Sequence, residues 1–324
     1  MHRVVIAGAG QIGSRHLQGL GKIDIPIRID VIDPSLSSLQ TAKQRFNEVP
    51  FNNNVKSVNF YTRFEMTGQI VDLAIIATTA DVRAKVTREL CRSVTPKNIL
   101  FEKVVFQSVE DFTEIADLMS KHGINAWVNC SRRAYPFYNE LKKLFCDGDP
   151  ITYSVQGGEW GLACNAIHFI DHVAFLIDNT DYTISPSGLR EVFEAKRQGF
   201  IEFSGILQGI FSDESEFILQ SRRHSSTPHL ISIHGPSCRL VIDEKGGIAQ
   251  ISRMENGWTW EPLTFRIPLQ SELTNIIAKA ILQKEDCTLP AFADSFRLHA
   301  PMIECFLNHI EKVSHKKLKY CPIT

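Results

Sequence analysis

The sequence predicts an α/β domain with a doubly wound parallel sheet, followed by an α+β domain with a mostly antiparallel, open sheet. Three observations support this fold class. A glycine-rich turn joins the first apolar run to a helical pattern. Apolar runs then alternate with helical patterns to about residue 125, which is typical of parallel strands joined by helices. Beyond about residue 150, alternating runs rich in β-branched residues are separated by Gly, Pro, Asp and Ser.

The first element is a short apolar strand, residues 4–7, that ends in the pattern Gly8, Gly10, Gly13. Gly8 lets the chain turn sharply, and Gly10 leaves room for a pyrophosphate to approach the backbone. Gly13 lets the following helix pack close to the strand. The N-terminus of that helix offers free N–H groups to phosphates. We therefore predict a Rossmann-type domain whose first dinucleotide contacts are Gly8, Gly10, Gln11, Ile12 and Gly13.

The acid that ends the second apolar run indicates which dinucleotide binds. Asp33 lies 20 residues after Gly13, where a carboxylate can bind the ribose 2′-hydroxyl of NAD. Pro34 and Ser35 follow, without an Arg. Because an acid repels a 2′-phosphate, we expect NAD in preference to NADP, although a rotated carboxylate beside Ser35 would admit NADP. The alternative is a glycine-rich turn in an unrelated α/β unit.

The other elements of the first domain alternate along the chain. Ligands of a parallel sheet bind beyond the carboxyl ends of its strands, so Thr78, Thr79 and Glu102 should line the same site as the glycine turn. The run 71–77 is almost continuously apolar, as expected for a strand buried on both faces. Helices are expected over 36–47, 81–94 and 108–121, and strands over 58–61, 71–77, 98–101 and 124–129.

The second domain is expected to be a meandering sheet with flanking helices. We place the NAD(P)-binding domain at 1–125 and a substrate-binding and oligomerisation domain at 126–324, with a last helix able to pack back on the first domain. An open sheet face often pairs with a copy of itself, so a homodimer or homotetramer through this sheet is expected. Strands are expected over 151–157, 198–211, 214–223, 230–235 and 238–243, and helices over 162–177, 270–284 and about 291–313.

Composition narrows the class of protein. The 324 residues allow two domains, and 35 basic against 36 acidic residues give no case for a nucleic-acid or anionic-membrane partner. No apolar run reaches membrane-spanning length, and we expect no signal peptide because the first residues lead directly into the first strand. We expect a cytoplasmic protein with reduced thiols and no metal site, because the eight cysteines are scattered without CxxC or zinc-finger spacing. They are Cys91, Cys130, Cys146, Cys164, Cys238, Cys287, Cys305 and Cys321.

Lys103 is the first candidate for chemistry. It stands beside Glu102 at the end of a buried strand. A lysine there can donate to a substrate hydroxyl or carbonyl and can transfer a proton. From position alone, an ordinary surface lysine is an equal alternative.

A polar stripe on the apolar helix 162–177 is the second candidate. A polar stripe on a buried helix needs partners or a ligand. His168 is central and could act as a general base, or it could be a hydrogen-bonded core histidine. A metal site also fits the spacing, although no further cluster completes it. The residues of the stripe, spaced at three and four, are Cys164, Asn165, His168, Asp171 and His172.

Two arginine pairs bear on the substrate. Arg132 and Arg133 follow Asn129 just after the last strand of the first domain. They could bind an anionic or hydroxyl-rich substrate, or they could form salt bridges at the domain seam. Arg222 and Arg223 could bind a phosphate or carboxylate of a ligand, or they could lie at a solvated strand end.

Several segments together resemble the Gfo/Idh/MocA family of NAD(P)-dependent oxidoreductases, named after glucose–fructose oxidoreductase and inositol dehydrogenase. By this resemblance Lys103 binds substrate and handles a proton, and His168 is the catalytic histidine. The glycine turn and Asp33 bind the cofactor, with Thr78 and Glu102 on its nicotinamide side. The segments are VVIAGAGQIGSRHL, DLAIIATTADVRAKV, ILFEKVVFQS, VNCSRR, GGEWGLACNAIHFIDHV and LPAFADSFRLHAPMIECFL.

The resemblance implies a dehydrogenase or reductase acting on CH–OH groups of a polyhydroxylated substrate: a sugar, sugar derivative or nucleotide sugar. Two departures leave open a catalytically weak or regulatory NAD(H)-binding protein. Val104 replaces a motif proline that fixes the backbone around the lysine, and Cys164 stands where many members have Asp. Asn165 could take part of that role. The expected substrate contacts are Asn129, Arg132, Asn165, Asp171 and His172.

Overall fold

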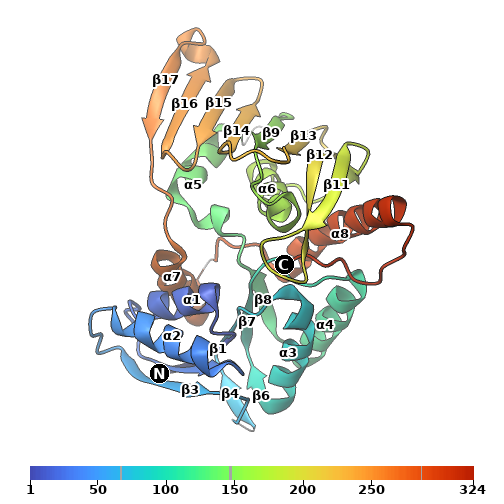
Figure 1. Cartoon of the computed structure of the whole chain (residues 1–324). Helices are drawn as coiled ribbons and strands as arrows, with labels where there is room; N and C mark the ends of the chain where they lie inside the picture. The colour runs from blue at the N-terminus through green and yellow to red at the C-terminus, as the bar shows by residue number, and fades with distance from the viewer. Residues whose placement is uncertain (66–67, 146–147, 286) are drawn as a thin grey trace. The chain divides into compact units, whose positions relative to one another are not determined.

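The computed structural model divides the chain into two compact units with different sheets (Figure 1). It describes residues 1–65, 68–145, 148–285 and 287–324. The first unit consists of Met1–Phe106, Glu110–Ser131 and Pro268–Ala293. The second consists of Gln107–Val109, Arg132–Ile267 and Asp294–Thr324.

The first unit contains a six-stranded parallel sheet in the order β3-β2-β1-β5-β7-β8. The chain reverses its direction across the sheet between β1 and β5, which is the switch point where doubly wound sheets bind ligands. Every residue of Leu73–Ile76 is fully buried, as predicted for a strand covered on both faces. The strands are β1 (His2–Ala7), β2 (Ile27–Ile32), β3 (Val55–Tyr61), β5 (Leu73–Ile76), β7 (Asn98–Phe101) and β8 (Asn125–Val128).

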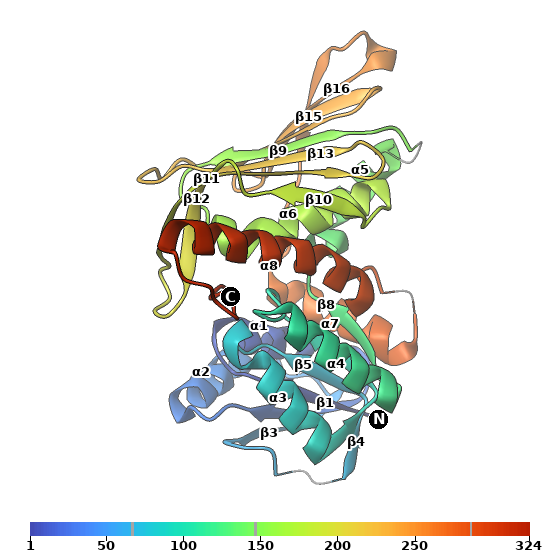
Figure 2. The same ribbon diagram turned by 90° about the vertical axis from the view of Figure 1, so that its right-hand side faces the viewer.

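Helices cover both faces of this sheet (Figures 1 and 2). Right-handed crossovers place α1 (Gln11–Leu20) and α2 (Leu36–Asn47) on one face. The opposite face carries α3 (Ala80–Ser93) and α4 (Val109–His122). Two short strands, β4 (Gln69–Val71) and β6 (Val94–Pro96), pair separately.

The helix α7 (Gln270–Gln283) also belongs to the first unit, whereas the sequence analysis grouped it with the second sheet. It packs against α1, and the packing depends on a glycine. A Cβ atom on Gly19 would lie 2.6 Å from the Thr274 Cβ, so only glycine allows this approach. Such a contact joins residues more than 250 positions apart, and no local pattern indicates it.

The second unit is built on a nine-stranded sheet in the order β10-β12-β13-β9-β14-β15-β16-β17, with β11 paired to β12. Its pairs are antiparallel except for β13 with β9, which are parallel. The sheet is therefore mostly antiparallel, as predicted, but it is not a simple meander because its first strand lies in the centre. The strands are β9 (Thr152–Gly157), β10 (Tyr182–Ser185), β11 (Leu189–Glu194), β12 (Ile201–Phe211), β13 (Glu216–Ser221), β14 (Leu230–His234), β15 (Cys238–Asp243), β16 (Ile248–Arg253) and β17 (Trp260–Thr264).

Two long helices lie against one face of this sheet (Figure 2). α6 (Leu162–Ile177) packs on β12 and β13, and α5 (Pro136–Lys142) packs on α6. α8 (Phe292–Ser314) contacts β12 through Phe306 and Phe203, whose ring centroids are 4.7 Å apart. Side chains toward the helices are buried, and those on the other face are partly exposed. No helix in the described residues is long and apolar enough to cross a membrane.

Candidate active site

The glycine turn after β1 has the geometry that close approach of a dinucleotide requires. Gly8 has φ +98°, a conformation that favours glycine, and a Cβ there would lie 2.8 Å from the Thr78 nitrogen. A Cβ on Gly13 would lie 1.8 Å from the Gly8 oxygen. At Gly10, the N-cap of α1, a Cβ would meet no atom within 4 Å. The turn is thus closely packed on its inner side and open at Gly10, beside the first N–H groups of α1.

Asp33 is held beside this turn by two backbone bonds. Its Oδ2 accepts the N–H of Ala9 at 2.7 Å, and its Oδ1 accepts the N–H of Ser35 at 2.8 Å. The carboxylate is partly exposed, so its remaining lone pairs can accept ribose hydroxyls. The structure thus brings together the glycine turn and the acid that the sequence analysis assigned to one site.

Arg45 of α2 is a neighbour that the sequence analysis missed. Its guanidinium donates to the Gln11 side-chain oxygen at 2.7 Å and to the Ser14 hydroxyl at 2.6 Å. It fixes α2 against the first turn of α1 and adds positive charge near the end of α1 where a phosphate would bind. No motif indicates it, because the contact depends on how the two helices pack.

Thr78 follows β5, the neighbouring strand on the other side of the switch point. Among the described residues, its Oγ1 is buried and has no hydrogen-bond partner. Thr79 is the N-cap of α3. A buried hydroxyl without a partner is unusual and favours a ligand group that completes it. Together with the open space at Gly10 and the fixed Asp33 carboxylate, it shows that this end of the sheet fits a dinucleotide.

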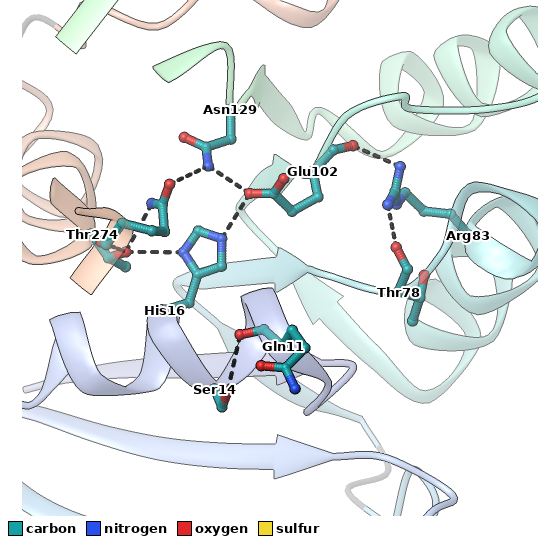
Figure 3. Close-up of polar contacts among 9 residues, drawn as sticks. Gln11, Ser14, His16, Thr78, Arg83, Glu102, Asn129 and Thr274 are labelled. Atoms are coloured by element: carbon teal, nitrogen blue, oxygen red, sulfur yellow. Dashed lines mark hydrogen bonds and ion pairs between the residues drawn. The ribbon is translucent and has the colours of Figure 1, made fainter. Parts of the chain in front are cut away.

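Glu102 and Lys103 follow β7 at the same edge of the sheet, and Figure 3 shows the contacts of Glu102. The Glu102 Oε1 accepts hydrogen bonds from His16 Nε2 at 2.9 Å and from Asn129 Nδ2 at 2.5 Å. Burial alone would raise the pKa of the Glu102 carboxyl, but these bonds and the charge of Arg83 outweigh burial and lower it. Glu102 is therefore a carboxylate, and His16 carries the proton on Nε2. Lys103, beside it, is partly exposed.

Asn129, a predicted substrate contact, lies in the same network. Its Nδ2 also donates to the Gln270 side-chain oxygen at 2.8 Å, so both of its amide hydrogens have internal acceptors. Its Oδ1 is buried without a hydrogen-bond partner in the described part of the chain. The amide oxygen is thus the atom of Asn129 left to meet a ligand.

In the second unit, α6 begins and ends where the sequence analysis predicted, after Gly161 in the left-handed conformation at φ +82°. The polar stripe of α6 divides into two groups. Cys164, Asn165 and His168 are partly exposed. The Asn165 Nδ2 donates to the Trp160 carbonyl at 2.9 Å, which steadies the loop before the helix.

Asp171 and His172 form the buried group and have no exposed surface. The Asp171 carboxylate binds the Arg133 guanidinium through two bonds of 2.8 and 2.9 Å. The His172 Nδ1 lies 2.9 Å from the Tyr153 hydroxyl, and burial lowers the pKa of His172 to about 3. Both side chains lie in the interior of the unit, and the buried His172 Nε2 has no hydrogen-bond partner among the described residues, so their contact with substrate stays a prediction.

Arg132 is also ion-paired inside the second unit. It donates to both oxygens of Glu244, at 2.9 and 2.6 Å, and its guanidinium lies 4.1 Å from the centre of the Phe169 ring. Arg223 similarly binds Glu159 at 2.8 Å. Arg132 thus forms a salt bridge as the alternative proposed, but within the second unit and not at the domain seam, and Arg223 is ion-paired where a solvated strand end was the alternative. Glu244 was missed, because 112 residues separate it from Arg132.

Glu202 of β12 is a further residue that the sequence analysis missed. It is 8% exposed, and its Oε2 accepts the N–H of Ala163 at 2.7 Å, at the first turn of α6. Burial raises the pKa of Glu202, although hydrogen bonds from Cys164 and Ala163 oppose this effect. Glu202 thus brings a carboxyl group next to Cys164, where the family resemblance leads one to expect an acid.

Within the described ranges, no group of three or more His, Cys, Asp or Glu side chains is placed to hold a metal ion. Seven cysteines lie in these ranges, and Cys146 lies outside the described residues.

Comparisons with known proteins agree with the geometry of the first unit. Residues 2–130 match the family model GFO_IDH_MocA, an oxidoreductase family with an NAD-binding Rossmann fold. Residues 2–130 are thus similar to the Gfo/Idh/MocA family over about two fifths of the chain. The match spans all six strands of the parallel sheet, and it confirms the resemblance described above for the segments within residues 2–130. A search of curated proteins returns no match.

Solved structures share the fold of nearly the whole chain. An oxidoreductase from Agrobacterium radiobacter in complex with NAD+, L-tartaric acid and magnesium is 14% identical, covers 93% of this chain and 94% of its own, and has a TM-score of 0.69. The UDP-N-acetylglucosamine 3-dehydrogenase GnnA from Acidithiobacillus ferrooxidans is 12% identical. The alignment covers 94% of this chain and 97% of GnnA, with a TM-score of 0.66. The transcriptional regulator Gal80p from Kluyveromyces lactis is 14% identical. The alignment covers 96% of this chain and 92% of Gal80p, with a TM-score of 0.68. At these identities the likeness establishes the fold only.

Proposed function

We propose that this protein is an NAD-dependent oxidoreductase that transfers a hydride between the nicotinamide and a hydroxyl or carbonyl group of a sugar, sugar derivative or nucleotide sugar. The observation that carries the proposal is the position of Glu102 and Lys103 in the first unit. They follow β7 at the edge of the sheet that also bears the glycine turn, Asp33 and the Thr78 Oγ1. The sugar class is supported by the name of GnnA, a nucleotide-sugar dehydrogenase with the same fold.

In this proposal, two residues handle the reacting oxygen and its proton. The Lys103 ammonium donates to the oxygen and stabilises the alkoxide that develops there. The hydroxyl proton is accepted by the His168 imidazole, or by Lys103 as a neutral amine, which thereby becomes the ammonium that stabilises the alkoxide. Asp33 binds the ribose hydroxyls, and its charge disfavours a 2′-phosphate. The bound NAD supplies a ring that accepts or donates the hydride.

A titration with NADH and, in parallel, NADPH tests the cofactor assignment. We expect NADH to bind and NADPH to bind much more weakly, as measured by the fluorescence of the reduced nicotinamide. Asp33→Ala should reduce the difference between the affinities for NADH and NADPH, because the carboxylate that repels the 2′-phosphate is removed. Binding of neither nucleotide would refute the dehydrogenase proposal. If NADH binds, absorbance changes with a panel of sugars, polyols and nucleotide sugars then identify the substrate.

A regulatory NAD(H)-binding protein is the second candidate. It is favoured by Cys164, which replaces an acid of the family pattern, and by the shared fold with the regulator Gal80p. The carboxyl group of Glu202 beside Cys164 supports the enzyme instead. Tight NADH binding without turnover on any compound of the panel would favour the regulatory role.

A further inference from the structure

We infer that Arg83 is a positioning residue for Lys103, and that its guanidinium fixes the backbone on both sides of this lysine. The inference rests on the proposed function, because it concerns the same site. Valine at position 104 does not restrict its own φ angle as proline would. The segment after β7 therefore needs another constraint if Lys103 is to have one position.

The contacts of Arg83 supply that constraint. Arg83 lies in the first turn of α3 and is 2% exposed. Its Nη1 donates to the carbonyls of Glu102 at 2.7 Å and Val105 at 3.0 Å, and also to the carbonyl of Val104. One guanidinium nitrogen thus holds carbonyl groups before and after Lys103.

The second nitrogen of the guanidinium reaches the neighbouring strand end. Nη2 donates to the carbonyl of Thr78, and Figure 3 shows Arg83 between Thr78 and Glu102. The planar guanidinium has donors in fixed directions, so it sets the spacing between the two segments. Arg83 therefore links the backbone at Lys103 to Thr78, whose buried hydroxyl has no hydrogen-bond partner among the described residues.

The residue before Lys103 is fixed at its side chain as well. His16 and Asn129 hold the Glu102 carboxylate, and the His16 Nδ1 lies 3.0 Å from the Thr274 hydroxyl of α7. The buried charge of Arg83 is offset by the four carbonyl dipoles and by the negative charge of Glu102. Val104 is fully buried, which keeps the segment from turning outward.

The test combines removal of the guanidinium with a compensating change. Arg83→Met should lower kcat by about 10²-fold, the scale expected when a reacting group is misplaced by about 1 Å. Proline at position 104 restricts the backbone without a guanidinium. The double variant Arg83→Met, Val104→Pro should therefore have a kcat at least tenfold higher than Arg83→Met alone. A role of Arg83 in general stability would not be rescued in this way. Unchanged kcat in Arg83→Met, or no recovery in the double variant, would overturn the inference.

Hydrogen exchange at the amides of residues 102–106 gives a readout that does not need turnover. Exchange there should rise in Arg83→Met and return toward the wild-type rate with Val104→Pro. Arg88→Met is the matched control, because Arg88 lies on the same helix and pairs with Asp111 and Glu114 instead. If Arg83→Met fails to fold, Arg83→Lys keeps the charge but cannot span both segments, and the same increase is expected. Wild-type exchange rates at residues 102–106 in the Arg83 variants would refute the positioning role. Absence of turnover in the unmodified protein would refute only the proposed function.

Discussion

Single residues set the chemistry that this chain can perform. Lys103 is partly exposed, yet the residue before it is fixed at backbone and side chain. His168 is partly exposed on α6, while its neighbours Asp171 and His172 are buried and bonded. Local sequence could indicate Lys103, Asp33 and His168, because each stands at a recognisable place in a motif. It could not indicate Arg83, Glu202 or Glu244, because their partners come from distant segments.

Removing the Lys103 ammonium should remove most of the turnover and leave cofactor binding intact. We expect Lys103→Met to lower kcat by about 10²-fold or more, which is the usual contribution of a positioned proton-transfer group. NADH affinity should stay unchanged, since the glycine turn and Asp33 are untouched. Steady-state kinetics and a fluorescence titration measure the two effects. Lys97→Met is the control for losing an exposed lysine of the same unit, and turnover of Lys103→Met at the wild-type rate would exclude this lysine from the mechanism.

The buried Glu202 predicts a pH-dependent stability. Its pKa is raised in the folded state, so the folded protein keeps the proton to a higher pH than the unfolded chain does. Stability is therefore lost as the pH rises from the ordinary glutamate pKa through the raised value. Glu202→Gln keeps an acceptor for the Ala163 N–H without this loss. Its melting temperature should exceed that of the wild type at pH 8, and the difference should shrink toward pH 4.

The exposed Glu216 of β13 provides the control for this measurement. Glu216→Gln should show no comparable change with pH. The melting temperatures of Glu202→Gln and wild type could instead differ by the same amount from pH 4 to pH 8. That result would mean that ionisation of Glu202 carries no stability cost.

At the scale of elements, strong periodicity was enough to locate the long helices and several strands. The predicted bounds of the helices at 36–47 and 162–177 and of the strand at 238–243 agree with the structure. Short or exposed elements such as α5, β10, β11, β16 and β17 were missed, since few of their residues are apolar in a regular pattern. The central place of β9 was missed because its parallel partner β13 lies some 60 residues away.

Two glycines of the turn between β1 and α1 should respond differently to alanine. Gly10→Ala adds a methyl group in open space at φ −64°, so the melting temperature should stay near that of the wild type while NADH affinity falls at least tenfold. Gly13→Ala forces atoms apart next to Gly8 and should cost about 1–3 kcal/mol of stability. Thermal denaturation and NADH titration of both variants measure the contrast. Equal NADH affinity in Gly10→Ala and wild type would show that no phosphate approaches this glycine.

At the scale of the whole molecule, the open face of the second sheet bears on assembly. The strand register aligns Gln208, Ile218, Ser154, Ser232 and Val241 across five neighbouring strands, and all of them keep some exposure. Ile210 and Leu230 on this sheet are 43% and 44% exposed. This row of uncharged side chains suits a flat contact with a second copy of itself, and the neighbouring row on the same face adds the charged Glu216 and Arg239 at its rim.

We therefore propose that the chain forms a homodimer or homotetramer through this face, and light scattering after gel filtration tests it. The mass should be about two or four times the 36.6 kDa of one chain. The double variant Ile218→Lys, Val241→Glu should shift the mass toward one chain, because burying charges without designed partners costs several kcal/mol. Ile276→Lys changes an equally apolar side chain that is 62% exposed on α7, and it should leave the mass unchanged. A wild type with the mass of one chain, or a double variant with the wild-type mass, would place the contact elsewhere or exclude it.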